Sequence, residues 1–559
     1  MRNSITLFAM AGLGAMLSAC AATPVPEPVA SLPPAAAILP ERVPALPEAI
    51  AFASIEELQA GMAQGRFTAV QLVGFYQARI ESIDRSGPNL RAVLALNPDA
   101  LRDAEALDLE RKAKGPRGPL HGIPILIKDN IETQDRMATT AGSLALKDNL
   151  TGRDAPLVAR LRAAGAIILG KTNLSEWANI RDGDSTSGWS AMGGLTRNPH
   201  ALDRSACGSS SGSGAAVAAG LAAAAIGTET DGSVVCPASM NGIVGLKPTV
   251  GLVSRRHIVP ISSSQDTAGP MARSVRDVAV LLSVIAGSDS QDPATAQADA
   301  RRADYADGLG QASLAGKRFG YFKNYGAPPQ VGLDAMWARS IEALRRAGAS
   351  VIVIEEEPPN DKIGEAEFLV LLTELKAGMA AYLQSLPANG VTVRSLADLI
   401  AFNSAHADQE LALFGQSVFI QAEASKGLSD PAYLKALANS RRLAGKDGLE
   451  RLLKLHKLDA IIAPTTGPAW QIDVINGDSY TGGNSTLAAV SGYPHLTLPM
   501  GIAQGLPAGL SFMGPAWSEG RLLALGAAFE GLVGPAPHPK FAANVDGEAA
   551  IAPLLIPAK

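Results

Sequence analysis

The feature that most constrains this chain is a long internal run of small residues. Residues 207–225 read CGSSSGSGAAVAAGLAAAA, in which only Val217 and Leu221 have bulky side chains. Gly/Ser-rich composition is typical of flexible linkers, but this run lies mid-chain and continues into Ala215–Ala225, which predicts a helix. Because a helix with almost no side-chain volume can approach a sheet or another helix closely, we expect it at the centre of the molecule.

Composition favours one large globule over a string of small modules. The chain has 559 residues, of which 47% are hydrophobic and 18% are charged. The charged fraction is below the roughly 25% of typical soluble domains, which fits a large core with little surface per residue. The net charge of −5, with basic residues scattered, gives no reason to expect nucleic-acid binding.

The N-terminus has the pattern of an export signal. Arg2 is followed by the apolar run Ile5–Leu17, which is too short to span a bilayer comfortably. The run ends in LSAC, which resembles a bacterial lipobox with Cys20 as the lipidated residue. We therefore predict a lipoprotein signal peptide at 1–19 and a lipid-anchored protein on the periplasmic side of a bacterial membrane. An ordinary secretory signal cut near Ala22 is the alternative, and it also exports the chain.

Three further segments follow from composition. Residues 20–48 are rich in proline and predict an extended tether. We expect the folded domain at 49–540 and a C-terminal tail at 541–559.

With Cys20 lipidated, Cys207 and Cys236 remain; they could pair in an exported protein or stay as buried free thiols.

Short apolar runs alternate with helical segments, which predicts an α/β layered architecture. Ile123–Ile127 has the composition of a buried strand and delivers Lys128 at its end. Pro156–Ala164 predicts a helix and Ala166–Leu169 a second strand. Further predicted elements are the capped helices beginning after Ser54 and Thr68, the strand Arg91–Leu96, the helix Asp99–Lys112, and the strands Leu458–Ala463, His495–Pro499 and Ala508–Met513.

The serine-rich loop admits three interpretations as part of a hydrolase. Residues 208–212 match the G-x-S-x-G nucleophile elbow centred on Ser210, but that elbow must follow a buried strand, and 198–205 is a polar loop. The S-x-x-K pattern of penicillin-binding enzymes is absent, because no serine lies three positions before a lysine. The third interpretation makes the loop one part of a dispersed site.

That dispersed pattern resembles the amidase signature family over about residues 50–535. The family has a Lys-Asp pair after a buried strand, a Gly/Ser loop, and a G-T-D-x-G-G-S segment before a proline. The matching segments here are Lys128-Asp129, residues 207–213, and residues 227–233, with flanking matches at 170–174, 196–199, 245–249 and 505–509. The resemblance implies a large central mixed β-sheet covered by helices on both faces, in a single compact domain.

By the same resemblance, Ser233 is the nucleophile, Ser209 the bridging serine and Lys128 the base. A serine hydroxyl needs an adjacent base to become a good nucleophile. Lysine can act as that base only when it is neutral, which burial at a strand end would favour. The arrangement is a Ser-Ser-Lys variant of the triad logic, and it requires no metal or cofactor.

The resemblance also assigns supporting groups around the nucleophile. The backbone N–H groups of Thr230, Asp231, Gly232 and Ser233 would form the oxyanion hole. The peptide bond before Ser209 would be cis, and Ser210 would be a hydrogen-bonding neighbour. Histidines His121, His257 and His495 lack a partner motif, so we interpret them as structural.

Several positions depart from the general family and bear on the substrate. Glu229, Asp231, Cys207, Ser211 and Val235 replace residues common elsewhere in the family. With these residues, the segments 175–179, 207–213, 229–233 and 395–403 are most similar to those of the peptide amidases, which release ammonia from the C-terminal carboxamides of peptides.

Three alternatives to a peptide amidase stay open at this stage. One is a broad-specificity hydrolase of acyl, aryl or fatty amides. The glutamyl-tRNA amidotransferase A subunit shares the triad, but it works in the cytoplasm with partner subunits, and the export signal argues against it. From another class, the chain could be a non-catalytic, peptide-binding lipoprotein. The expected partner is a small-molecule or peptide amide, and the oligomeric state stays open.

Overall fold

The computed structural model describes residues 46–324, 331–388 and 390–555, all within one compact unit assigned to Ala45–Lys559. The predicted signal peptide, Cys20 and most of the predicted tether lie outside these residues. Within the described ranges, no helix has the length and hydropathy needed to cross a membrane.

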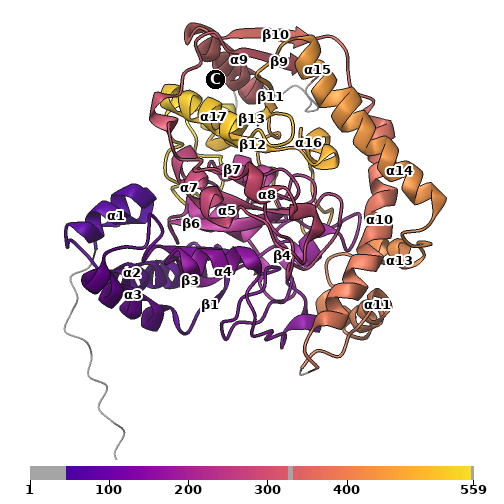
Figure 1. Ribbon diagram of the computed structural model, residues 1–559, viewed down its shortest axis with the longest axis horizontal. Coiled ribbons are helices and arrows are strands. Elements are labelled where there is room, and N and C mark those ends of the chain that lie inside the picture. Colours follow the sequence, from indigo (N-terminus) through magenta and orange to yellow (C-terminus); the bar gives the residue numbers. More distant parts are fainter. Residues whose placement is uncertain (1–45, 325–330, 389, 556–559) are drawn as a thin grey trace, which may run out of the picture. The chain divides into compact units, whose positions relative to one another are not determined.

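An eleven-stranded mixed sheet runs through the unit (Figure 1). Its order is β1-β3-β2-β6-β8-β7-β12-β13-β11-β9-β10. The strands are β1 Val93–Leu96, β2 Pro124–Lys128, β3 Ile167–Thr172, β6 Ala224–Glu229, β7 Val244–Lys247, β8 Thr267–Ala272, β9 Arg318–Phe322, β10 Ser350–Ile354, β11 Ala460–Pro464, β12 His495–Ala503 and β13 Leu506–Met513. A separate hairpin joins β4 Trp189–Ser190 to β5 Gly194–Leu195. The predicted α/β class and mixed sheet are confirmed.

The helices connect and cover these strands. They are α1 Ile55–Ala63, α2 Ala69–Arg79, α3 Ala100–Lys114, α4 Pro156–Ala163, α5 Ser211–Ala218, α6 Val235–Met240, α7 Val275–Ile285, α8 Ala298–Arg301, α9 Val331–Arg346, α10 Asn360–Ser385, α11 Leu396–Ala405, α12 Ala407–Glu410, α13 Ser417–Glu423, α14 Pro431–Arg441, α15 Arg451–Leu455, α16 Thr486–Ser491 and α17 Glu519–Val533. Short 3₁₀ and π segments are Glu48–Phe52, Ile80–Arg85, Leu144–Leu146, Glu176–Asn179, Pro293–Thr295, Leu309–Gln311, Arg442–Glu450 and Ala552–Leu555.

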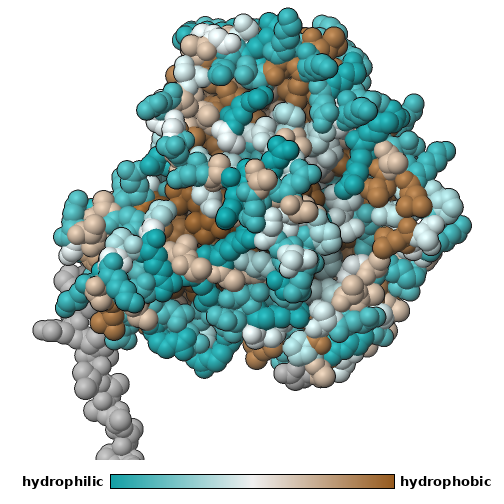
Figure 2. Space-filling model, in the orientation of Figure 1, coloured by the Kyte–Doolittle hydropathy of each residue, from teal (hydrophilic) through white to brown (hydrophobic). Residues whose placement is uncertain are grey.

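Both faces of the sheet carry helices. Helix α6 packs on β7, β12 and β13 and contacts α5, whereas α7 and α17 pack together on β7, β8 and β12. In Figure 1, α10, α11, α13 and α14 lie at the side of the sheet rather than on its middle, and α10 contacts both α13 and α14. The face in Figure 2 is mainly hydrophilic, with small hydrophobic groups such as the one near α13 and α14.

The central strands are buried along their whole length. All residues of β2, β3 and β6 are buried, as expected for parallel strands covered on both sides. Strand β2 pairs in parallel with β3 and with β6. The carboxyl ends of these three strands therefore meet at one edge of the sheet, where Lys128, Thr172 and Glu229 lie.

The small-residue run forms a helix, but not with the predicted bounds. Helix α5 covers Ser211–Ala218, so it begins inside the serine-rich loop, and Ala224 and Ala225 already belong to β6. Gly220 has φ +67°, a conformation that ends the helix. The predicted helix over Ala215–Ala225 is wrong at both ends. It begins earlier because packing makes residues 211–214 helical, and pairing with β2 and β8 places Ala224 and Ala225 in a strand although alanine favours helices.

The predicted central place of this helix is confirmed. Helix α5 contacts β2, β3, β6 and β8, and all of its residues are buried. A Cβ atom on Gly212 would lie 2.2 Å from the Ala92 carbonyl oxygen, and one on Gly208 would lie 2.1 Å from Ser175 Oγ. The glycines are therefore required by the close approach of neighbouring groups.

The segment after residue 540, predicted as a tail, contacts the domain. The N–H of Leu202 donates to the Ala542 carbonyl, and Phe541 N–H donates to the Pro199 carbonyl. Val545 is buried in the same cluster as Cys207.

Candidate active site

Lys128, the predicted base, ends β2 and is fully buried. Its Nζ lies 2.8 Å from Ser209 Oγ, 2.8 Å from Thr228 Oγ1 and 3.2 Å from the Thr228 carbonyl oxygen. The parallel pairing of β2 with β6 brings Thr228 beside Lys128. The structure thus brings two of the three predicted catalytic residues into direct contact.

The surroundings of Lys128 favour its neutral form. Burial lowers the pKa of its amine to about 7, against the opposing charges of Glu229 and Asp266. The carboxylate of the neighbouring Asp129 pairs instead with Lys171 at 3.3 Å and accepts hydrogen bonds from Thr140. In the part of the chain that the structure describes, no carboxylate forms an ion pair with Lys128.

Ser209 and Ser210 link the loop to the turn that carries Ser233. Ser209 is fully buried, and the Gly208–Ser209 peptide bond is cis, as the family resemblance implies. The N–H of Ser210 donates to the Ser233 carbonyl at 3.1 Å, and the Ser210 hydroxyl donates to the Thr228 carbonyl. The predicted supporting residue therefore joins the loop both to β6 and to the predicted nucleophile.

Ser233 lies in the short turn between β6 and α6. One carboxylate oxygen of Glu229 accepts the N–H groups of Val234 and Val235, at 2.8 and 3.0 Å, and so fixes the start of α6. Gly232 has φ +83°, which glycine adopts without strain. These contacts shape the turn tightly around Ser233, which is 8% exposed.

The backbone of this turn presents unused donors. Among the described residues, none accepts a hydrogen bond from the N–H groups of Thr230, Asp231, Gly232 and Ser233. Buried N–H groups are nearly always paired in folded proteins, so a row of free ones is typical of a site that binds an oxygen atom of a ligand.

These groups face a cavity of about 600 Å³. Its walls are the turn 230–233, the loop residues Cys207 and Gly208, and segments from 178–187 and 470–486. Trp470 and Tyr480 supply aromatic surface, and the carboxylate of Asp478 accepts the Trp470 indole N–H at 3.1 Å. Within the described chain, the lining residues include two carboxylates, Asp231 and Asp478, and no lysine or arginine.

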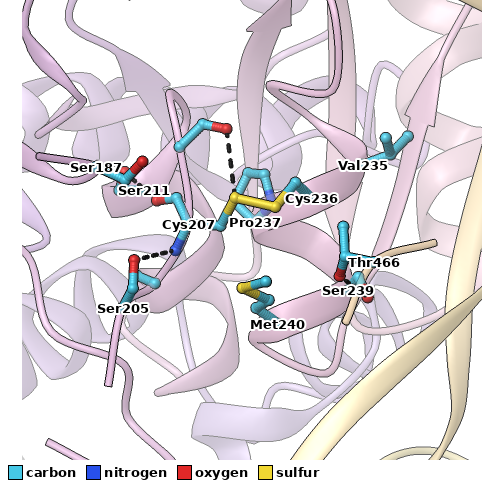
Figure 3. Close-up of a disulfide and its surroundings, with 12 residues drawn as sticks. Ser187, Ser205, Cys207, Ser211, Val235, Cys236, Pro237, Ser239, Met240 and Thr466 are labelled. Carbon is cyan, nitrogen blue, oxygen red and sulfur yellow. Dashed lines mark hydrogen bonds between the residues drawn. A yellow bond between two sulfur atoms is a disulfide. The ribbon is translucent and has the colours of Figure 1, made fainter. Parts of the chain in front are cut away.

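A disulfide closes one wall of the cavity (Figure 3). Cys207 and Cys236 are bonded, which settles the choice between a pair and two free thiols. Figure 3 shows the bond joining the loop before Ser209 to helix α6. It therefore connects covalently the two segments that carry Ser209 and Ser233.

The histidines lie elsewhere, and the described residues hold no candidate metal centre. The imidazole of His121 contacts the Leu107 carbonyl, His257 faces Glu132, and His495 contacts Ser511. None of the three is among the described residues that line the cavity. No group of three or more His, Cys, Asp or Glu side chains in the described ranges is arranged to hold a metal ion.

Two side chains that support the turn 230–233 were not predicted from the sequence. The Asp266 carboxylate accepts the Thr230 hydroxyl at 2.6 Å, and Glu367 of α10 reaches the same turn through Gln265. Both come from segments without a recognisable motif, and Glu367 is far from the turn in sequence. An acidic residue on the apolar side of a helix is the one signal that could have singled out Glu367.

The comparisons with known proteins agree with this geometry. A family model described as Amidase matches residues 71–523. The structure of native peptide amidase from Stenotrophomonas maltophilia superposes with a TM-score of 0.83 at 53% identity, covering 88% of this chain and 98% of that one. A structure of a peptide amidase in complex with the competitive inhibitor chymostatin gives a TM-score of 0.84 at 53% identity, covering 87% and 99%.

Curated relatives extend the likeness to other organisms. A probable amidase from Arabidopsis thaliana is 40% identical over 489 residues, which are 86% of this chain and 89% of the relative. The glutamyl-tRNA(Gln) amidotransferase A subunit of Acinetobacter baumannii is 37% identical over 484 residues, which are 84% of this chain and 94% of the relative.

Proposed function

Because this chain belongs to the amidase signature family and is an amide-hydrolysing enzyme, we propose that it releases ammonia from the C-terminal carboxamides of peptides, using Ser233, Ser209 and Lys128. The observation that carries the proposal is the contact between the buried amine of Lys128 and Ser209 Oγ, beside the turn of Ser233.

The contacts of Lys128 suit both protonation states that a base must pass through. In the charged form, three N–H donors reach Ser209 Oγ and the two oxygens of Thr228. A neutral amine has two N–H donors and one lone pair. In the neutral form, two donors suffice for Thr228 and the lone pair is left facing the Ser209 hydroxyl. Lys128 then draws a proton from Ser209, while Ser209 takes the proton of Ser233 as Ser233 attacks the amide carbon.

The free N–H groups of residues 230–233 receive the negative oxygen that forms on attack. One such donor is typically worth about 3 kcal/mol in the transition state. The protonated Lys128 returns its proton through Ser209 to the leaving nitrogen, and ammonia departs. Water then follows the same path to release the acyl group from Ser233 as a carboxylic acid.

The cavity supports a neutral carboxamide as the reacting group. A free C-terminal carboxylate would meet Asp231 and Asp478 without a cation among the described lining residues. The same charges favour departure of the carboxylate product. The similarity to solved peptide amidases, one with a bound competitive inhibitor, supports a peptide over a simple acyl, aryl or fatty amide.

We further propose that the chain is exported and attached to a bacterial membrane through a lipid on Cys20. The lipobox-like sequence at that position supports this. The disulfide between Cys207 and Cys236 is a second support, since disulfides persist mainly in oxidising compartments. Export also argues against the role of the glutamyl-tRNA amidotransferase A subunit, which requires the cytoplasm.

The test is an ammonia-release assay on the mature protein lacking residues 1–20, with a panel of peptide amides, acyl amides and aryl amides. We expect turnover of peptide amides and a loss of at least about a thousandfold in Ser233→Ala. Full activity in Ser233→Ala contradicts the proposed role of Ser233 as the nucleophile. Turnover of simple amides alone contradicts only the peptide substrate, and binding of peptides without turnover points to the non-catalytic alternative.

A further inference from the structure

The turn of Ser233 is supported from a distant helix by a buried acid. Glu367 of α10 is 7% exposed, and its Oε1 accepts a hydrogen bond from Gln265 Nε2 at 2.7 Å. The same amide nitrogen donates to the Thr230 carbonyl at 3.3 Å. The Glu367 carboxyl group also contacts the carboxyl group of Asp231. Glu367 thus supports two consecutive residues whose N–H groups face the cavity.

The two carboxyl groups need one proton between them. Asp231 Oδ2 accepts the Thr486 hydroxyl at 2.7 Å, and the Ser485 hydroxyl also acts on this carboxylate. Asp231 Oδ1 is buried and, within the described chain, has no hydrogen-bond partner. Two buried carboxylates in contact repel each other strongly. A proton on Glu367 removes the repulsion and supplies Oδ1 with the donor that it lacks.

We propose that Glu367 is a positioning residue that stays a neutral carboxylic acid and donates a hydrogen bond to Asp231, holding the oxyanion-binding turn in place. The activity readout of this proposal rests on the proposed amide hydrolysis, and the stability readout below does not. The bond runs from the Glu367 hydroxyl to Asp231 Oδ1, while Thr486 holds the other oxygen of the aspartate.

The surroundings decide which acid keeps the proton. Asp231 is the better carboxylate, because the hydroxyls of Ser485 and Thr486 donate to it. Lys247 adds support while it is charged, and burial lowers the pKa of its amine to about 8. Among the described residues, the amide of Gln265 is the one hydrogen-bond donor that would stabilise a charge on Glu367. Burial and the charge of Asp231 raise the pKa of Glu367 to about 9.

Other titratable groups near the pair come from several elements, among them Tyr480, on which Asp231 acts. Glu229 lies on β6 next to the turn, where Asp231 acts on it. Asp266 holds the Thr230 hydroxyl, and Arg441 of α14 donates to the Ser264 carbonyl beside Gln265. None of them donates a hydrogen bond to Glu367.

The proposal predicts that the rate of hydrolysis depends on pH at both an acid and an alkaline limb. Hydrolysis should rise with pH near 7, as the Lys128 amine loses its proton. It should fall again near pH 9, as Glu367 ionises and repels Asp231. The two limbs belong to different groups, and Lys247, with a pKa of about 8, titrates between them in every variant. Only the part of the alkaline limb that moves in Glu367→Gln is therefore assigned to Glu367.

The experiment measures kcat/KM for a peptide amide between pH 5.5 and 10.5 in four proteins. Glu367→Gln keeps a donor for Asp231, and we expect it to stay within about fivefold of wild type at pH 8 while its alkaline limb moves up by at least one pH unit. Glu367→Leu has no donor and should lose at least about thirtyfold at pH 8, mainly in kcat. Glu365→Gln removes an exposed acid from the same helix and should keep both limbs.

A stability readout separates this proposal from the proposed function. The folded pKa of Glu367 lies above its unfolded value, so folded wild type binds the extra proton and loses stability as pH rises from about 4.5 to 9. The melting temperature of Glu367→Gln should therefore gain on wild type across that range, whether or not a substrate is turned over. An unchanged melting difference, an unchanged alkaline limb, or equal losses in the Gln and Leu variants overturns the proposal.

Discussion

The amine of Lys128 is fully buried, has no carboxylate partner in the described chain, and has a pKa lowered from 10.5 to about 7. A shift of that size corresponds to a loss of fold stability on the order of 5 kcal/mol at and below pH 7, where the buried amine carries its charge. The same burial leaves a lone pair available to Ser209 near neutral pH. Burial of Lys128 thus lowers the stability of the fold and at the same time makes its amine available as a base.

Replacing this lysine by methionine should therefore stabilise the fold while removing the activity. Between pH 7 and 10.5 the unfolded chain binds the lysine proton and the folded chain does not, so the unfolding free energy of wild type rises with pH. We expect Lys128→Met to be more stable by about 2 kcal/mol at pH 6, after the lost hydrogen bonds are subtracted, and to lose this advantage by pH 10.5.

Urea unfolding of both proteins at several pH values measures this difference, with ammonia release as the activity control. A stability gain that is the same at pH 6 and pH 10 would contradict a neutral, buried Lys128.

At the scale of elements, the small side chains of α5 let its neighbours pack closely against it. Its buried residues let β6 and the serine loop lie close enough for Ser210 to contact both Thr228 and Ser233. The disulfide and the Glu229 carboxylate then fix α6 against the same loop. The positions of Ser209 and Ser233 follow from how closely these short elements pack.

A single methyl group should therefore be enough to disrupt the packing at α5. In Gly212→Ala the new Cβ would lie 2.2 Å from the Ala92 carbonyl oxygen, which belongs to backbone and cannot rotate away. We expect a loss of more than about 4 kcal/mol or failure to fold. The matched control is Gly74→Ala in α2, where nothing lies within 4 Å, and which should gain about 0.5–1 kcal/mol.

Thermal unfolding of the two alanine variants distinguishes them. Similar melting temperatures would show that the close approach at Gly212 is not what requires glycine there.

Sequence reasoning went furthest where a local pattern carried the information. The capping boxes at Ser54 and Thr68 are present, and the strand ending at Lys128 has nearly its predicted bounds. The start of α5 was missed, because glycine and serine have low helix propensity and only tertiary packing makes them helical. Glu367 was missed because its partner Asp231 lies in another element, and no local pattern links them.

At the scale of the whole molecule, the proposed site draws on segments spread along most of the chain. Lys128, Ser209, Ser233 and Glu367 come from four different elements or loops. The order of the sheet, with β2 beside β6, is what turns distant motifs into contacts. The proposed catalytic groups all lie after residue 46. The role we propose for the segment before it is export and membrane attachment, and not catalysis.

Membrane attachment should accordingly depend on the sulfur atom of Cys20, which lies outside the proposed catalytic part of the chain. In the full chain expressed in a bacterial host, Cys20→Ser should move the protein from the membrane fraction to the soluble or secreted fraction, with kcat/KM within about twofold of wild type. Fractionation with immunoblotting and labelling by a fatty-acid analogue measure the change. Unaltered membrane association of Cys20→Ser would exclude lipidation at this residue as the anchor.

The two sides of the cavity have different kinds of support. The side with Ser233 is built from crowded core elements in which Gly212 already lacks room for a methyl group. The opposite side, with Trp470, Asp478 and Tyr480, comes from the connection between β11 and α16, where Ile475 is 86% exposed. We therefore expect selection for a new amide to act on this accessible connection, while the residues around Ser233 stay unchanged.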